Sequence, residues 1–134
     1  MILRLKRQHV DLLKEEARKV HPVEACAMLF GELTQKEAVV KRVVVAPNKL
    51  RSTVRFEIDP ETFANAFTEA YREGLDFIGL FHSHPAPAKP SLIDLKYMKL
   101  WGDAIWLILS STSGSLAAYQ MRDCRVQEII MKAE

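Results

Sequence analysis

The sequence has few cysteines, little excess charge and no long apolar run, and each absence excludes a class of protein. Its 134 residues include two cysteines, Cys26 and Cys124, which are too few for a disulfide scaffold and form no C-x-x-C pair. We interpret them as small buried residues, with a single disulfide as the alternative. Nineteen basic and seventeen acidic residues leave a net charge of +2, so no overall field attracts nucleic acid or an anionic membrane.

No stretch has the composition of a targeting or membrane segment. The basic residues Arg4, Lys6 and Arg7 near the start are not followed by an apolar run long enough for a secretory signal. No window approaches the ~18 apolar residues that a membrane span requires. The apolar fraction of 49% and the charged fraction of 27% are those of a soluble globular protein. We therefore expect a cytoplasmic protein with one domain over residues 1–134, because no linker or repeat divides the chain.

Apolar periodicity and capping signals predict three helices and a mixed set of strands. Helices are expected over 8–20, from Asp59-Pro60 to Gly74, and from the cap residue Ser91 to about Trp101. Strands are expected over 25–33, 36–46, 54–58, 76–81, 105–109 and 116–121, and 125–131 fits a strand or a terminal helix. This order predicts an α/β or α+β fold with a mixed, mostly antiparallel curved sheet flanked by helices. The G-x-G-x-x-G motif of a dinucleotide fold is absent.

Several aromatic and histidine side chains are assigned structural roles. Phe63, Phe67 and Tyr71 form a helical stripe, which is typical of a core-facing side. Trp101 and Trp106 are interpreted as core or interface residues. We expect His9 to face solvent and His21 to lie in a loop.

The motif that indicates a function starts with His82-Ser83-His84-Pro85. A stiff extended loop to Pro90 follows it, and then comes Ser91-Leu92-Ile93-Asp94. Two histidines at i and i+2 on extended chain project to one side, where their nitrogens can converge on a cation about 2 Å away. Asp94 adds a carboxylate from the first turn of the next helix. Two histidines and one carboxylate leave the fourth tetrahedral position of zinc open, as in catalytic sites. The alternatives are core histidines, a capping serine and a favourable charge at a helix N-terminus.

Glu24 is the candidate base for such a site. It lies at the start of an apolar strand in His21-Pro22-Val23-Glu24-Ala25-Cys26. A carboxylate entering a buried run is costly unless it has a partner. The alternative is a glutamate that faces solvent at the strand edge, and the residues alone do not separate the two.

These motifs resemble the JAMM (MPN+) metalloprotease family. Its signature is a glutamate on an early strand, then H-[ST]-H-P, a short spacer and S-x-x-D, which here are Glu24, residues 82–85 and residues 91–94. Pro22, Gly31, Asn48 and residues 56–60 are also similar, and the resemblance covers about residues 8–122. Two departures are a spacer of six residues between His84 and Ser91, where seven is usual, and Ala27 where relatives commonly have glycine.

The resemblance implies a fold, a chemistry and a class of partner. The fold is an MPN domain of cytidine-deaminase-like architecture, although the H-x-E and P-C-x-x-C pair of the deaminases is absent. His82, His84 and Asp94 would bind one Zn²⁺ per chain, with Glu24 as general base and Ser91 as donor to the oxyanion. The family is deubiquitinase-like: it cleaves (iso)peptide bonds after the C-terminal glycine of ubiquitin or ubiquitin-like proteins.

Three functions stay open at this point. One is a zinc isopeptidase that acts on small ubiquitin-like modifiers, whose extended tail would add as a strand at a sheet edge. The second removes an amino acid such as cysteine from the C-terminus of a sulfur-carrier protein. The third is a non-catalytic scaffold of the same fold, which the complete set of site residues argues against. No nucleic acid or membrane partner is expected, and a homodimer is left open.

Overall fold

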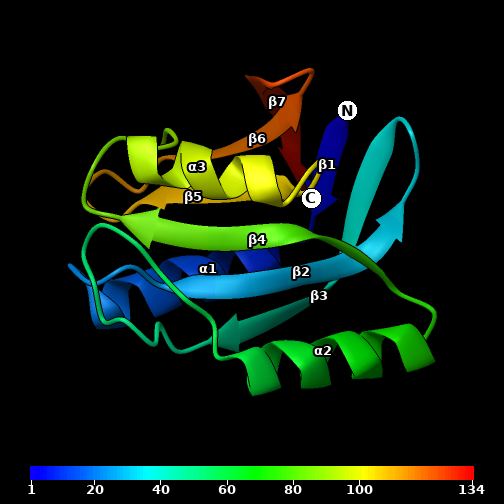
Figure 1. Cartoon of the computed structure of the whole chain (residues 1–134), viewed down its shortest axis with the longest axis horizontal. Coiled ribbons are helices and arrows are strands. Elements are labelled where there is room, and N and C mark those ends of the chain that lie inside the picture. The colour runs from blue at the N-terminus through cyan, green and yellow to red at the C-terminus, as the bar shows by residue number, and fades with distance from the viewer.

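Seven strands of the computed structural model, which describes residues 1–134, close into a barrel in the order β1-β3-β2-β4-β5-β6-β7 (Figure 1). The elements are β1 (Ile2–Leu5), α1 (Arg7–Val20), β2 (Cys26–Leu33), β3 (Glu37–Ala46), α2 (Pro60–Arg72), β4 (Asp76–His84), α3 (Leu92–Leu100), β5 (Ile105–Ser110), β6 (Leu116–Arg122) and β7 (Arg125–Ala133). β1 is parallel to β3 and β7, and β4 is parallel to β5, whereas the other pairs are antiparallel. The predicted α+β fold with a mixed sheet is confirmed.

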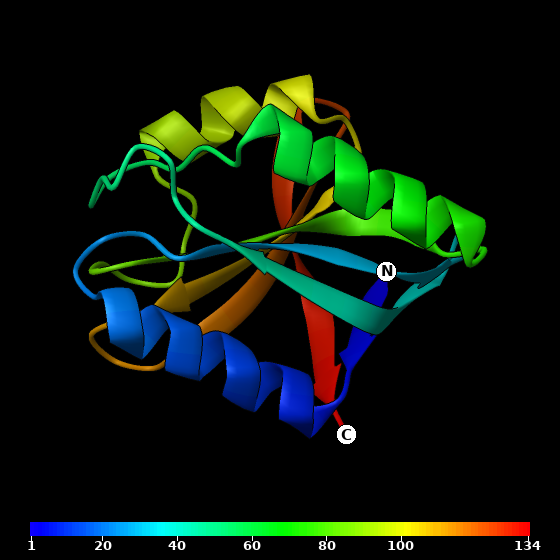
Figure 2. The same cartoon turned by 90° about the horizontal axis from the view of Figure 1, so that it is seen from below.

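The helices cover the two faces of the sheet. Figure 2 shows α1 on one side of the strands and α2 with α3 on the other. Successive residues of the central strands alternate between two apolar clusters, because side chains along a strand point to opposite faces. In β2, Ala27 and Leu29 pack with α1, while Cys26, Met28 and Phe30 pack toward α2 and α3. Burial on both faces explains why these strands are continuous apolar runs in the sequence.

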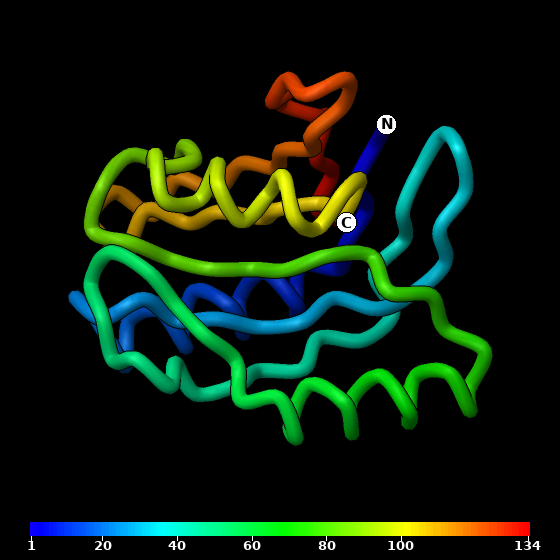
Figure 3. The backbone as a smooth tube through the Cα atoms, viewed as in Figure 1, coloured from blue at the N-terminus to red at the C-terminus, as the bar shows by residue number.

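β4 lies between β2 and β5 and carries the motif histidines at its end. Gly79 is required within this strand, because a Cβ atom there would collide with the backbone carbonyl of Ile105. Figure 3 shows that the segments 47–59 and 85–91 lie at the same end of the barrel, where β4 ends. This end of the molecule therefore brings together the motif histidines, the loop that leads to Ser91, and the segment between β3 and α2.

The helix signals of the sequence are confirmed. The side chain of Asp59 caps α2 by accepting a hydrogen bond from the Thr62 backbone N–H, with Pro60 in the first turn. Ser91 caps α3 in a full capping box with Asp94. Trp101 follows α3 directly, and Gly102 takes a positive φ of 64° just beyond it. No helix of the structure combines the length and the apolar character that crossing a membrane would require.

Three strand predictions need correction or completion. Residues 54–58 form no strand, because Glu57 pairs only with Lys49 and the side chain of Asn48 rather than with a neighbouring strand. β1 was not predicted, since four residues of short alternation give little signal, yet it closes the barrel. Residues 125–133 are a strand, not a helix. β1 closes the barrel by pairing with only residues 37–39 of β3, and the addition of a substrate strand at a sheet edge stays a prediction.

Some side-chain predictions were also wrong. Tyr71 is 84% exposed, because it lies on the outer side of α2 rather than on the stripe that packs on the sheet. Cys124 is exposed in the β6–β7 turn while Cys26 is buried, and both thiols are free. His9 is half-buried instead of facing solvent. The segment 85–90 bends, with the Lys89 N–H donating to the Pro87 carbonyl at 2.7 Å, rather than running fully extended. Trp106 is a core residue and Trp101 packs on Phe63 and Phe77, as predicted.

Candidate active site

His82 and His84 project from β4 to the face that α2 and α3 cover. His82 is fully buried and His84 nearly so. Ser83, between them, points to the opposite face, where its Oγ accepts the Ala25 N–H at 2.9 Å and its N–H donates to the Ala25 carbonyl at 3.0 Å. The middle residue of the motif therefore ties the start of β2 to the end of β4. As a result, Glu24 lies next to the histidines.

Asp94 reaches the histidines from the first turn of α3. Its Oδ2 accepts the Ser91 N–H at 2.9 Å, and its own N–H donates to Ser91 Oγ at 3.0 Å. The same Oδ2 lies 3.0 Å from His82 Nε2 and 3.9 Å from His84 Nε2. Burial by itself raises the pKa of Asp94, but the hydrogen bonds from His82 and Ser91 outweigh it, and the pKa lies below its ordinary value. Asp94 is therefore an anion held between two imidazoles.

The three side chains have the composition and spacing of a metal site. One ligand-type atom from each of His82, His84 and Asp94 lies within 4.8 Å of the others, and all three residues are buried. The Nδ1 atoms of both histidines are buried without a hydrogen-bond partner. Two imidazoles and a carboxylate are the donors that a borderline-soft divalent cation takes. The residues present therefore fit a metal ion, and the six-residue spacer does not prevent the set from converging.

Aromatic rings and a loop carbonyl hold the histidines in place. Phe56 stacks on His82 with ring centroids 5.0 Å apart and an interplanar angle of 22°, and Trp106 meets the same imidazole edge-on at 5.8 Å. His84 Nε2 lies 3.1 Å from the carbonyl of Lys89, because the loop after β4 turns back over the ring. Tyr119 fixes that loop by donating from its hydroxyl to the Ala88 carbonyl at 2.6 Å.

Glu24 precedes β2 and is 1% exposed, so the alternative of a solvent-facing glutamate is wrong. Its Oε1 is buried without a hydrogen-bond partner. Burial raises the pKa of Glu24 to about 7, an effect that the positive field of His82 partly offsets and that the charge of Asp94 increases. A carboxyl group that exchanges a proton near neutral pH is suited to general acid–base chemistry.

Protein treated with a chelator should lose stability as the pH rises from about 4.5, the ordinary pKa of a glutamate, to about 7. In this interval the folded protein keeps a proton on Glu24 that the unfolded chain has released, so the free energy of unfolding falls and then levels off above about 7. Glu24→Gln should lack this decline and be more stable than the wild type at pH 8 by on the order of 1–3 kcal/mol. Urea unfolding at pH 5 and pH 8 tests this, and a variant–wild-type difference that is the same at both pH values would contradict it.

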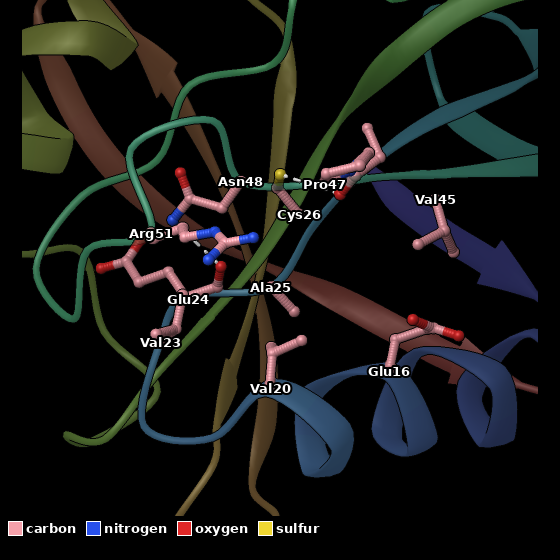
Figure 4. A pocket seen from close by; sticks show the side chains of 11 residues that line it. Glu16, Val20, Val23, Glu24, Ala25, Cys26, Val45, Pro47, Asn48 and Arg51 are labelled. Carbon is pink, nitrogen blue, oxygen red and sulfur yellow. Dashed lines mark hydrogen bonds between the residues drawn. The ribbon is translucent and has the colours of Figure 1, made fainter.

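Two clefts adjoin these residues. A cleft of about 570 Å³ is lined by both the candidate base and the capping serine; its wall consists of Glu24, Thr53, Val54, His84, Ala86, Pro87, Lys89, Pro90, Ser91, Leu92 and Ile93. A second cleft of about 530 Å³ lies between the end of α1, the end of β3 and the following loop (Figure 4). The first cleft is the one in which a substrate would reach Ser91 and His84.

The structure thus brings together all five residues named from the sequence, in the neighbourhood of one cleft. Sequence reasoning did not assign roles to Ser83, Phe56 or Tyr119, and it noted Asn48 only as a similarity. Their contacts join segments 24 to 58 residues apart in the chain, and no local pattern reports such a distance. His21 lies outside the cluster, where its Nδ1 is 2.8 Å from Ser111 Oγ.

The fold and the site together define an α+β barrel domain with a buried His/His/Asp metal site at the end of its central strand. The chain belongs to the family described as prokaryotic homologs of the JAB domain, whose model matches residues 6–127. The resemblance to the JAMM family is therefore confirmed.

The chain is also similar to named proteins and to solved structures. The chain is 47% identical over 89 residues to the desampylase of Pyrococcus furiosus, a match that covers 66% of this chain and 60% of that protein. It is 26% identical to the desampylase of Haloferax volcanii over 122 residues, 90% of this chain and 86% of the other. A solution structure from Desulfitobacterium hafniense superposes with a TM-score of 0.86 at 28% identity, covering 98% of this chain and 94% of that one. A Salinibacter ruber protein at 24% identity and a TM-score of 0.71, with 96% and 91% covered, supports the fold alone.

Proposed function

We propose that this protein is a zinc-dependent hydrolase that cleaves (iso)peptide bonds after the C-terminal glycine of small ubiquitin-like modifier proteins. The observation that carries the proposal is the convergence of Glu24, His82, His84, Ser91 and Asp94 from three separate segments of the chain. The names of the two desampylases support the choice of a small modifier as substrate.

In this proposal His82, His84 and Asp94 hold the zinc ion. When bound, zinc supplies Lewis-acid polarisation and lowers the pKa of water toward neutrality. Glu24 accepts the proton of the attacking water and delivers it to the leaving nitrogen. This role agrees with a buried carboxyl group whose pKa lies near 7. The free Oε1 of Glu24 leaves an acceptor available for that proton.

Ser91 is assigned to the carbonyl oxygen of the substrate. Its Oγ accepts the Asp94 N–H, so its own hydroxyl proton is free to be donated. The residue lines the 570 Å³ cleft together with His84, Thr53 and Val54. A hydroxyl held by a helix cap is fixed in direction before substrate arrives, which favours a developing oxyanion.

Ser91→Ala should lower kcat by about 10²-fold, because one oxyanion donor contributes on the order of 3 kcal/mol. It should also destabilise the fold by about 1 kcal/mol, since the cap of α3 is lost. Ser91→Thr keeps the hydroxyl and the cap and should retain most of the activity. Steady-state kinetics with a modifier conjugate, together with urea unfolding, separate the two effects. An effect on KM alone would contradict the role of Ser91 as a hydrogen-bond donor to the oxyanion.

The function is tested by incubating zinc-loaded protein with three forms of a β-grasp modifier: an isopeptide conjugate, a linear fusion and a C-terminal cysteine adduct. Mass spectrometry then identifies the products, with and without chelator. Chelator-sensitive release of a modifier that ends in its terminal glycine supports the proposal. Cleavage of the cysteine adduct alone would indicate that the substrate is a sulfur-carrier adduct and not a modifier conjugate. If zinc-loaded protein cleaves none of the three forms, the proposal is refuted and a non-catalytic scaffold is the remaining function.

A further inference from the structure

One side chain organises the segment between β3 and α2. The amide of Asn48 contacts five backbone groups: the carbonyls of Glu24 at 3.1 Å, Arg55 at 3.0 Å and Ser52 at 3.4 Å, and the N–H groups of Leu50 at 3.1 Å and Glu57 at 3.2 Å. An asparagine has two N–H donors and one carbonyl with two lone pairs, so its full capacity is used. The side chain is part-buried where it meets Glu24, which makes these bonds costly to lose.

The first consequence concerns Glu24. Its carbonyl accepts from Asn48 and its N–H donates to the Ser52 carbonyl at 2.8 Å, a residue of the same segment. Figure 4 shows the amide of Asn48 beside Glu24. Ser83 holds the next residue, Ala25, from β4. The backbone of Glu24 is thus fixed on both sides, while its carboxyl oxygen Oε1 has no partner.

The second consequence concerns His82. Arg55 and Glu57, the two neighbours of Phe56 in the chain, are both bonded to Asn48. The ring of Phe56 is the one that stacks on His82. Asn48 therefore determines where this ring lies, and the ring limits the rotation of the imidazole from one face while Trp106 meets it from another.

We propose that Asn48 is a positioning residue that fixes the Glu24 carboxyl and the His82 imidazole relative to each other, directly through the Glu24 backbone and indirectly through Phe56. This inference rests on the function proposed above. The base and the metal ligand lie on segments 58 residues apart, so a group that contacts both segments is needed to fix their relative position. A misplacement of about 1 Å can lower the rate by about 10²-fold. Mutation of a group that holds a metal-binding side chain in place typically lowers metal affinity by about 10–100-fold.

The test compares Asn48→Ala and Phe56→Leu with two matched controls. Asn65→Ala removes the other asparagine of the chain, which is exposed on α2. Phe67→Leu removes a ring that packs on Phe63 and Phe77 and does not touch His82. Phe56→Tyr keeps a ring at position 56. Zinc affinity is measured by competition with a chromophoric chelator, folding by urea unfolding of the metal-free protein, and kcat and KM with a modifier conjugate.

We expect Phe56→Leu to weaken zinc binding by about 10–100-fold, with Phe56→Tyr close to the wild type. Asn48→Ala should lower kcat by about 10²-fold with little change in KM, and should weaken zinc binding no further when combined with Phe56→Leu. The two controls should leave zinc affinity and kcat unchanged.

If the wild type binds zinc but both variants keep its affinity and its kcat, the positioning role is overturned while the proposed function stands. The positioning role is equally overturned if the variants lose only folding stability, or if Phe67→Leu weakens zinc binding as much as Phe56→Leu. A wild type that binds no zinc refutes the proposed function, and the inference that depends on it falls as well.

Discussion

Glu24→Gln should reduce turnover of a modifier conjugate by about 10²–10⁴-fold while zinc content and fold are unchanged. Gln has nearly the shape of Glu but cannot accept a proton at the oxygen that the reaction needs. The site accommodates the neutral form well, because burial raises the pKa of Glu24 to about 7. The effect should therefore lie in kcat rather than in KM. It is measured by steady-state kinetics together with zinc stoichiometry.

Glu16→Gln is the matched control for this prediction. Glu16 lines the neighbouring 530 Å³ cleft, and its carboxylate pairs with Lys19 on the surface of α1. An ion pair of this kind contributes little to stability. The control should keep the activity of the wild type. Glu24→Gln with normal turnover would remove Glu24 as the base, whereas equal losses in both variants would point to a general effect of charge.

The parts of the fold that could be predicted are those with local causes. Helix α2 begins where Asp59 caps the chain, and α3 begins at Ser91, because a capping carboxylate or hydroxyl acts within one turn. Strands β2 and β5 are buried on both faces, so their apolar runs identify them directly. β1 has only four residues, and its role depends on pairing with β3 and β7 far along the chain. Local pattern does not contain that information.

The same distinction between local and long-range causes applies to the site residues. His82, His84, Ser91 and Asp94 lie within thirteen residues, so their spacing on a strand, a loop and a capped helix predicts convergence. Whether Glu24 is buried or exposed depends on the contact of its backbone with Ser52 and on the contact of the next residue, Ala25, with Ser83; its sequence neighbours left both interpretations open. Residues 54–58 alternate like a strand because Phe56 and Ile58 do pack inward. The alternation reports burial correctly, but the hydrogen bonds go to Asn48 and Lys49 instead of to a strand.

His84→Ala should abolish tight zinc binding and with it the response of folding stability to zinc. A ligand that binds only the folded state stabilises it by about 2.7 kcal/mol at a concentration of 100 Kd. The wild type should show this increase in urea unfolding and lose it on chelation, whereas the variant should show neither. His84 is a better test than Asp94, because Asp94 also completes the cap of α3, and its loss would disturb the helix itself.

His21→Ala provides the control for loss of an imidazole. His21 is exposed and contacts Ser111 rather than the cluster, so its removal should leave zinc affinity unchanged. His84→Ala also loses the contact with the Lys89 carbonyl, which costs about 1 kcal/mol in the metal-free protein as well. Only the difference between zinc-loaded and metal-free stability therefore reports on ligation. Since zinc has three protein ligands in this assignment, removing one leaves two, and a variant that keeps the zinc-dependent increase in stability shows that the ion is held elsewhere.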